Sequence, residues 1–421
     1  MLEEKYNNYQ NAIAVGVGLS GYDATILQEE LDELVLLADT AQTKVSEIVI
    51  QNKNKIDPST FVGKGKIKSI INNARALDCK LIIFNNELSP AQLKNIQKLA
   101  GEDLSVIDRT GLILNIFEKH AKTKESKAQI KLAKLNYLLP RLTRQWTHLE
   151  RQMGGLGTRG GPGETQIEID RRLIRREIAS LKAQLKKIQN QRATQHKSRE
   201  SMYKVSLAGY TNAGKSSVMK CLSGSSVYIQ NQLFATLDTT TRKIESKNQY
   251  DFLLSDTVGF IRNLPHDLIA SFRSTLMEVA ESDIIVKVLD ASSPNIDVHL
   301  STIEDVFKTL NIEKKIELLA FNKIDLIPSS KISRLKSRYP EAIFISAYKQ
   351  IKLNELFDLI QSKLSMLNIV SDISIPYSQF SIIDYIYKNC KVLQREDRDK
   401  DVILKIESSK ATVRKIHSRL K

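Results

Sequence analysis

The sequence predicts an α/β protein with two α/β domains, a helical hairpin between them and a small α+β domain at the C-terminal end. In two separate regions, short apolar strands alternate with helical stretches, which is the pattern of α/β domains. Between these regions, large apolar residues recur at alternating steps of three and four, as in the seam of two packed helices. The second α/β region carries a glycine-rich motif, GYTNAGKS, between a strand and a helix.

Residues 1–118 are predicted to form the first α/β domain. Strands are expected in AIAVGVGL, VSEIVIQ and KLIIFNN, because each is a short run rich in aliphatic residues. Helices are expected in TILQEELDELVLLADTA and SPAQLKNIQKLA, where apolar residues return every three or four positions.

Residues 119–200 are predicted to form an antiparallel helical hairpin. Two series of apolar residues have the spacing of a helix–helix seam, and Pro140 should kink or split the first helix. A glycine-rich stretch lies between the two series and would form the tip. The first series is Leu132, Leu135, Leu139, Leu142, Trp146 and Leu149, and the second is Ile174, Ile178, Leu181, Leu185 and Ile188.

The tip contains a match to the dinucleotide-binding pattern G-x-G-x-x-G at residues 155–160. That pattern binds a pyrophosphate only where a strand enters the glycines and a helix leaves them. Here a helix, LTRQWTHLERQM, is predicted to enter, so we reject this interpretation. Residues 154–163 include six glycines, more than a turn between two helices needs. Because glycine lets a backbone approach a partner closely, we favour a contact tip over a simple flexible turn.

Most of the positive charge lies in the same region. The formal net charge of the chain is +15, and residues 121–200 hold 19 Lys and Arg against 7 Asp and Glu, so +12 belongs to the hairpin. A charge run is often only a solvated helix face, but here one element with a glycine-rich tip holds nearly all of the excess. This favours contact with an RNA backbone. The candidate contacts are Gly155, Gly157, Arg159, Gly160, Arg171, Arg172, Arg175 and Arg176.

Residues 201–367 are predicted to form the second α/β domain, and residues 368–421 the small α+β domain. The cysteines at 79, 221 and 390 are far apart in the sequence, which argues against a disulfide framework or a zinc site. No stretch resembles a signal peptide or a transmembrane helix, so we expect a cytoplasmic protein.

The strand YKVSLA is followed by GYTNAGKSS and a predicted helix. This is the P-loop pattern G-x-x-x-x-G-K-S in its required context of strand, loop and helix. Backbone N–H groups of such a loop cradle a β-phosphate. The lysine, here Lys215, neutralises β- and γ-phosphate oxygens, and the serine hydroxyl, here Ser216, ligates Mg²⁺.

An NKID motif after the strand IELLAF predicts recognition of guanine. The Asp325 carboxylate can accept from both N1–H and N2–H₂ of guanine, an arrangement that adenine does not offer, and the wrong base would leave polar groups unpaired. Asn322 is expected to contact the P-loop and the base. A backbone N–H within residues 346–348, after the strand AIFI, is expected to meet guanine O6.

A DTVG motif lies between the P-loop and NKID. We expect Asp256 to hold Mg²⁺ through a water and the Gly259 N–H to sense the γ-phosphate. In the upstream stretch LFATLDTTTR, Thr236 is our choice for the switch threonine that closes on Mg²⁺ and γ-phosphate. The rivals are Thr239, Thr240 and Thr241.

The ordered set GYTNAGKS, FATLD, DTVGF, NKID and SAY resembles the motifs of TRAFAC-class GTPases. Together with SVIDRTGLILNIFEKHAKTKESKAQIKLAKLNYLLPRL and GGLGTRGGPGETQIEIDRR, it resembles the HflX family of ribosome-associated GTPases, over roughly residues 10–365. The resemblance implies a P-loop GTPase domain that hydrolyses GTP with Mg²⁺. It also implies binding to the large ribosomal subunit and, under stress, ribosome splitting.

The position after DTVG holds Phe260, where a glutamine commonly orients the attacking water. Phenylalanine cannot do so, and we therefore expect slow hydrolysis until a ribosome supplies the missing group. His266 is an alternative, although a packing or solvent role for it is the simpler interpretation. Asn212 indicates K⁺ as a second candidate cofactor, because in some related GTPases an asparagine at this position helps coordinate K⁺ beside the phosphates.

We expect a monomer that binds GTP or GDP and large-subunit RNA, and no DNA. Two other hypotheses stay open: a GTPase that assists the assembly of immature subunits, and an ATP-dependent RNA remodeller, against which Asp325 argues. The predicted Mg²⁺ ligands are Ser216, Thr236 and, through water, Asp256. The predicted nucleotide contacts are Gly209, Tyr210, Thr211, Asn212, Ala213, Gly214, Lys215, Ser216, Ser217, Phe234, Ala235, Thr236, Leu237, Asp238, Asp256, Thr257, Val258, Gly259, Asn322, Lys323, Ile324, Asp325, Ser346, Ala347 and Tyr348.

Overall fold

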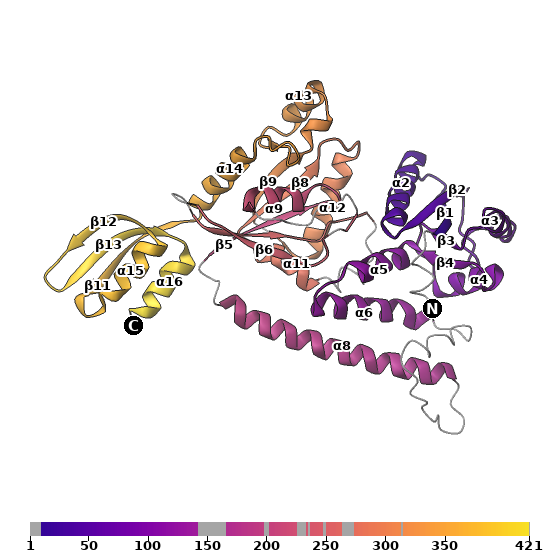
Figure 1. The fold of residues 1–421 in the computed structure, drawn as a ribbon, viewed down its shortest axis with the longest axis horizontal. Coiled ribbons are helices and arrows are strands. Elements are labelled where there is room, and N and C mark those ends of the chain that lie inside the picture. Colours follow the sequence, from indigo (N-terminus) through magenta and orange to yellow (C-terminus); the bar gives the residue numbers. More distant parts are fainter. Residues whose placement is uncertain are drawn as a thin grey trace. The chain divides into compact units, whose positions relative to one another are not determined.

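The computed structural model describes residues 10–141, 166–197, 202–224, 233–234, 236–246, 250–262, 273–312 and 315–420. These residues divide into two compact units (Figure 1). The first unit draws on Met1–Ile188, Gln230–Asp238 and Ile261–Arg273, and the second on Gln189–Ile229, Thr239–Phe260 and Ser274–Lys421. The predicted tip with Gly155, Gly157, Arg159 and Gly160 lies outside the described residues, as do Leu142, Trp146, Leu149, Ala235 and His266.

The first unit is built on a parallel four-stranded sheet in the order β2-β1-β3-β4. The side chains of β1 alternate between the two faces. Ile13, Val15 and Val17 join the core formed with α3 and α4, whereas Gly16 lies close to Leu31 of α2. The strands are β1 Gln10–Leu19, β2 Thr43–Lys53, β3 Leu81–Phe84 and β4 Ser105–Asp108, and the helices are α2 Ala24–Thr40, α3 Lys64–Ala76, α4 Pro90–Ala100 and α5 Arg109–His120.

Every strand and helix predicted for the N-terminal region forms, and three further elements, α3, β4 and α5, were not predicted. The start of α5 has a local cause. Asp108, at the end of β4, is the N-cap of the helix, and its side chain accepts a hydrogen bond of 2.9 Å from Gly111 N. The apolar run that follows is buried along its length, so it lacks the polar face that reveals an amphipathic helix.

The two hairpin helices pack against each other as predicted. Helix α6 Lys124–Leu138 ends directly before a 3₁₀ turn at Leu139–Arg141, which contains Pro140, and the chain that follows the turn lies outside the described residues. Figure 1 shows α6 alongside α8 Gln166–Lys197, and the seam between them includes Leu132, Leu135, Ile174, Ile178 and Leu181. The candidate RNA contacts on α8 are all exposed: Arg171, Arg172, Arg175 and Arg176.

The second unit contains a six-stranded sheet in the order β10-β9-β8-β5-β7-β6, in which only β6 is antiparallel to its neighbour. The core of this part is formed by the central strands with α9 and α14. The strands are β5 Tyr203–Gly209, β6 Thr240–Ile244, β7 Phe252–Asp256, β8 Ile284–Asp290, β9 Ile316–Asn322 and β10 Ile343–Phe344. The helices are α9 Lys215–Ser223, α11 Arg273–Ala280, α12 Ile296–Thr309, α13 Ser329–Arg338 and α14 Leu353–Ser365, with a 3₁₀ turn at Ile324–Leu326.

The C-terminal part of the second unit is an antiparallel sheet in the order β11-β13-β12 with its own core against α15 and α16. The α+β prediction for this region is therefore confirmed. Its strands are β11 Ile369–Pro376, β12 Lys391–Asp397 and β13 Asp401–Ser408, and its helices are α15 Ser381–Asn389 and α16 Lys410–Arg419, with a 3₁₀ turn at Tyr377–Gln379.

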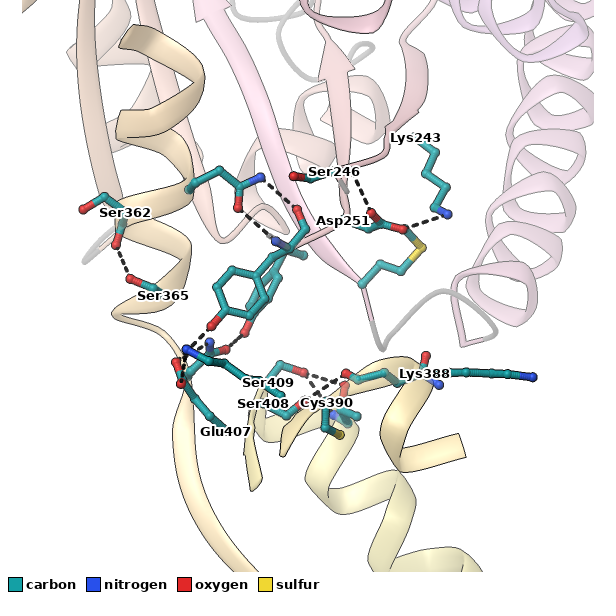
Figure 2. Close-up of a pocket in the computed structure, with 18 of the residues that line it drawn as sticks. Lys243, Ser246, Asp251, Ser362, Ser365, Lys388, Cys390, Glu407, Ser408 and Ser409 are labelled. Carbon is teal, nitrogen blue, oxygen red and sulfur yellow. Dashed lines mark hydrogen bonds and ion pairs between the residues drawn. The ribbon is translucent and has the colours of Figure 1, made fainter. Parts of the chain in front are cut away.

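A polar cavity of about 950 Å³ lies where this C-terminal part meets the larger sheet. Figure 2 shows Lys243 and Asp251 on one side of it and Glu407 and Ser408 on the other. The Tyr250 hydroxyl donates to Glu407 Oε1 over 2.9 Å. Burial, followed by this hydrogen bond, raises the pKa of Tyr250 to about 12. The polar groups thus bond across the cavity and join the C-terminal part to the β6–β7 region.

Candidate nucleotide site

The predicted nucleotide motifs gather at one edge of the six-stranded sheet. The P-loop follows β5, and Asp256 and Asn322 are the last residues of β7 and β9. These strands run parallel, so their carboxyl ends lie along the same edge. Ligands of open α/β sheets bind at this edge.

The backbone of the P-loop has the shape that its sequence requires. Asn212 has a φ of 61° and Gly214 a φ of 91°, both in the left-handed region. A Cβ atom on Gly214 would lie 2.2 Å from Asn322 Nδ2, so only glycine fits here. Helix α9 then begins at Lys215, so the N-terminus of this helix lies at the loop. The positive end of its dipole makes the loop suitable for binding an anion.

Lys215 is buried and hydrogen-bonded within the loop. Its Nζ donates to Gly209 O over 3.1 Å and to Tyr210 O over 3.0 Å. Burial lowers the pKa of this ammonium group to about 8, although the nearby Asp256 carboxylate acts in the opposite direction. A phosphate beside Lys215 would replace the lost hydration and stabilise the charged form.

Two of the three predicted Mg²⁺ ligands lie together. Ser216 Oγ donates to Asp256 Oδ2 over 2.5 Å, and Asp256 is 1% exposed. A hydroxyl and one carboxylate, completed by phosphates and waters, suit Mg²⁺, which seldom uses an all-protein cage. The donor set therefore fits the ion, and within the described residues no group of three His, Cys, Asp or Glu forms an alternative metal site.

Asn322 joins the P-loop to the loop after β10. Its Nδ2 donates to Ala213 O over 2.9 Å, and its Oδ1 accepts from Ala347 N over 2.9 Å. Both hydrogen bonds are buried, and Asn322 is 2% exposed. The loop contact expected for Asn322 is present, and the bond to residue 347 adds a link that its sequence position does not indicate.

The side chains around Asp325 hold it in place. Ser346 Oγ donates to Asp325 Oδ1 over 2.6 Å and accepts from Lys349 N over 3.0 Å.

Lys323 of the same motif forms an ion pair of 2.7 Å with Asp290 at the end of β8. Asp290 and the Ser346 side chain were missed by sequence reasoning, because neither belongs to a motif that assigns it this contact.

Phe260 is part of the core. It is 2% exposed, and its ring meets Phe307 of α12 edge-on at 6.1 Å. Its backbone N donates to Gly209 O over 3.0 Å and its O accepts from Thr211 N over 2.8 Å. The DTVGF segment is thus paired with the P-loop backbone, and a Cβ on Gly259 would come within 2.8 Å of Thr211 Cα. The Phe260 side chain is buried and carries no polar group that could orient a water.

The threonines proposed for the switch role have different surroundings. Thr239 Oγ1 donates to Glu278 Oε1 over 3.0 Å, and Thr241 Oγ1 lies 3.0 Å from Ser255 Oγ. Thr240 begins β6. Thr236 belongs to the segment that is grouped with the first unit, whereas Ser216 and Asp256 belong to the second.

A P-loop after the central strand, the NKID motif at the same sheet edge and the DTVG segment beside the P-loop are the features of a P-loop GTPase. Three matches to known families agree with this class. Residues 28–118 match "GTP-binding GTPase N-terminal", residues 120–199 match "GTP-binding GTPase Middle Region" and residues 204–323 match "50S ribosome-binding GTPase".

The relatives identify the family. The chain is 46% identical over 325 residues to GTPase HflX of Flavobacterium psychrophilum, covering 77% of this chain and 78% of that one. It is 37% identical over 408 residues to GTPase HflX of Caldanaerobacter subterraneus, covering 96% and 92%, and 39% identical over 341 residues to GTPase HflX of Escherichia coli, covering 80% and 79%. The chain belongs to the HflX GTPase family and is a GTP hydrolase.

Among solved structures, a "crystal structure of SsGBP and GDP complex" is 25% identical, with a TM-score of 0.48, over 84% of this chain and 99% of that one. A GTP-binding protein from Sulfolobus solfataricus in complex with GDP is 24% identical, with a TM-score of 0.45, over 84% and 98%. In the described part of this chain, no helix combines the length and apolar character that a membrane crossing requires.

Proposed function

We propose that this GTPase binds the large ribosomal subunit and uses its GTP state to split or rescue ribosomes under stress. The supporting observation is the concentration of charge in residues 121–200, which hold +12 of the net +15. Arg171, Arg172, Arg175 and Arg176 are exposed beside the buried stripe of α8. Arginines on such a rigid helix suit phosphates at fixed spacing, and phosphate contacts position a protein on RNA without reading sequence.

In this proposal four parts divide the work. Residues 1–118 form the N-terminal domain, residues 119–200 the RNA-binding arm, residues 201–367 the GTPase domain and residues 368–421 a small C-terminal domain. The glycine-rich tip at 154–163, with Arg159, would enter a cavity in the RNA that bulkier side chains could not enter. The protein would act as a cytoplasmic monomer without binding DNA.

The proposed chemistry requires Mg²⁺ held by Ser216, Thr236 and, through water, Asp256. The P-loop, NKID and residue 346–348 contacts would bind GTP as the motifs predict. Hydrolysis by the free protein would be slow, since Phe260 is buried and offers no group to the water. Ribosomes would accelerate it, and K⁺ beside Asn212 would assist by stabilising charge on the phosphates.

The second candidate function is assembly of the large subunit by the same GTPase. The same charge distribution supports it, because immature and mature subunits both present RNA phosphates. Comparing binding to immature subunits with binding to intact ribosomes separates the two functions. An ATP-dependent RNA remodeller would be revealed by competition between ATP and GTP.

The arm is tested by replacing Arg171, Arg172, Arg175 and Arg176 together with glutamine. We expect weaker binding to large subunits and a salt dependence shallower by about 3 to 4 in the log–log slope, as for four lost phosphate contacts. In the control variant, four exposed lysines of α3 and α4 are replaced with glutamine instead. This variant should keep the wild-type slope of affinity against salt concentration. Equal effects of both variants would show that only overall charge matters and would contradict the proposal. The control positions are Lys64, Lys68, Lys94 and Lys98.

A further inference from the structure

The segment containing Thr236 is anchored on the first unit. Leu233 N donates to Thr40 Oγ1 over 3.3 Å, and the ring of Phe234 meets Phe117 of α5 edge-on at 4.6 Å. Leu233, Phe234 and Leu237 are 6%, 3% and 2% exposed. Leu233 and Phe234 therefore contact α2 and α5 of the N-terminal domain, and Leu237, on the other side of Thr236, is also buried.

Asp238 binds the N-terminus of α6, the first helix of the arm. Its Oδ2 accepts from Lys122 N over 3.0 Å and from Thr123 N over 3.2 Å, and its Oδ1 accepts from Thr123 Oγ1 over 2.6 Å. Thr123 is itself the N-cap of α6, and its Oγ1 accepts from Ser126 N over 3.1 Å. A carboxylate at this end of a helix accepts hydrogen bonds from N–H groups that have no partner within the helix. Its negative charge also interacts favourably with the positive end of the helix dipole.

Bonds from N–H and O–H groups to a carboxylate such as Asp238 are charge-assisted, and such bonds are stronger than those between neutral groups.

The chain passes from one unit to the other directly after these anchors. Asp238 is the last residue of its segment in the first unit, and Thr239, which bonds to Glu278, belongs to the second. The other motif segment changes unit after Phe260. There Arg262 forms a 3.0 Å ion pair with Glu29 of α2. The segment with Thr236 and the residues that directly follow DTVGF therefore both belong to the first unit.

We propose that Asp238 is a positioning residue that keeps Thr236 on the N-terminal domain until GTP binds, and that closure of Thr236 on Mg²⁺·GTP withdraws Asp238 from α6. Two residues of extended chain span only about 7 Å, so Thr236 and Asp238 cannot move independently. Withdrawal frees the Lys122 and Thr123 amides and the Thr123 hydroxyl at the start of α6 and so transmits the nucleotide state to the arm. The inference rests on the proposed function for the role of the arm, but the Asp238–α6 contact can be measured without ribosomes.

Hydrogen exchange of the full-length protein tests the inference directly. Amides at the start of α6, residues 122–127, should exchange about five- to thirty-fold faster with Mg²⁺ and a non-hydrolysable GTP analogue than with GDP, the range expected when hydrogen bonds that hold a helix start are lost. In Asp238→Asn these amides should exchange fast with both nucleotides. Glu118→Gln, which removes the partner of Lys134 on α6 without touching the segment at 233–238, should behave as the wild type.

Two results would overturn the inference: equal exchange with both nucleotides in the wild type, or an unchanged nucleotide response in Asp238→Asn. If Asp238 only stabilised the start of α6 and did not respond to nucleotide, the wild type would show equal exchange with both nucleotides. The functional readout is ribosome binding, where Asp238→Asn should bind large subunits equally well with GDP and with the GTP analogue. If the exchange results appear as expected but wild-type binding ignores the nucleotide, the proposed function fails and the Asp238 contact stands.

Discussion

Raising the pH should weaken GTP and GDP binding because Lys215 is buried in the free protein. Its pKa of about 8 lies below the usual value near 10.5, so the ammonium group loses its proton between pH 7 and 9. Bound phosphates favour the charged form and raise this pKa. Binding is therefore almost fully favoured at pH 7 and below, and it includes a growing proton uptake as the pH rises through 8.

The size of the effect follows from the pKa. About nine in ten Lys215 side chains are charged at pH 7 and about one in ten at pH 9, so affinity should fall about tenfold, or about 1.4 kcal/mol, over this interval. Nucleotide phosphates are almost fully ionised throughout the interval, because their last pKa is near 6. They contribute little to the change.

Titration calorimetry at several pH values measures both affinity and proton uptake. At pH 8.5 the wild type should take up most of one proton per nucleotide, detected by comparing buffers of different ionisation enthalpy. The affinity of Lys215→Arg for nucleotide can differ from that of the wild type, but it should not change with pH, since arginine keeps its charge. A flat wild-type profile without proton uptake would refute the reasoning.

Further outcomes follow from other contacts. Asp325→Asn should shift preference from guanine to xanthine nucleotides in competition assays, and an unchanged preference would contradict the base-reading assignment. Phe260→Gln should not accelerate hydrolysis, and it should lose about 3 kcal/mol or more in chemical unfolding because the site is buried, whereas Phe260→Leu should lose less. Tyr250→Phe should cost about 1 kcal/mol of stability through the lost bond to Glu407, with GTP hydrolysis unchanged. Replacing K⁺ by Na⁺ should slow ribosome-stimulated hydrolysis in the wild type, and Asn212→Ala should remove the difference between the two ions.

The parts of the fold that sequence could predict are those with local signals. The strand before the P-loop, the glycine at 214 and the seam of α6 and α8 each follow from spacing or from a backbone requirement within a few residues. Helix α5 was missed because it is buried almost completely, which hides the periodicity of an amphipathic helix.

The contacts that could not be predicted join distant parts of the chain. Asp238 lies 115 residues from Thr123, and a carboxylate that caps a helix from such a distance leaves no pattern in the sequence near that helix. Ser346 and Asp325 are 21 residues apart and meet only because β9 and β10 are neighbours in the sheet. Fold topology, rather than motif spacing, creates both contacts.

Whether nucleotide state governs engagement of the ribosome is tested most directly by sedimentation of intact ribosomes with the full-length protein and GTP, GDP or a non-hydrolysable GTP analogue. The protein should move with the large subunit, and free subunits should increase, with GTP and with the analogue but not with GDP. Identical profiles with all three nucleotides would contradict a GTP-controlled arm.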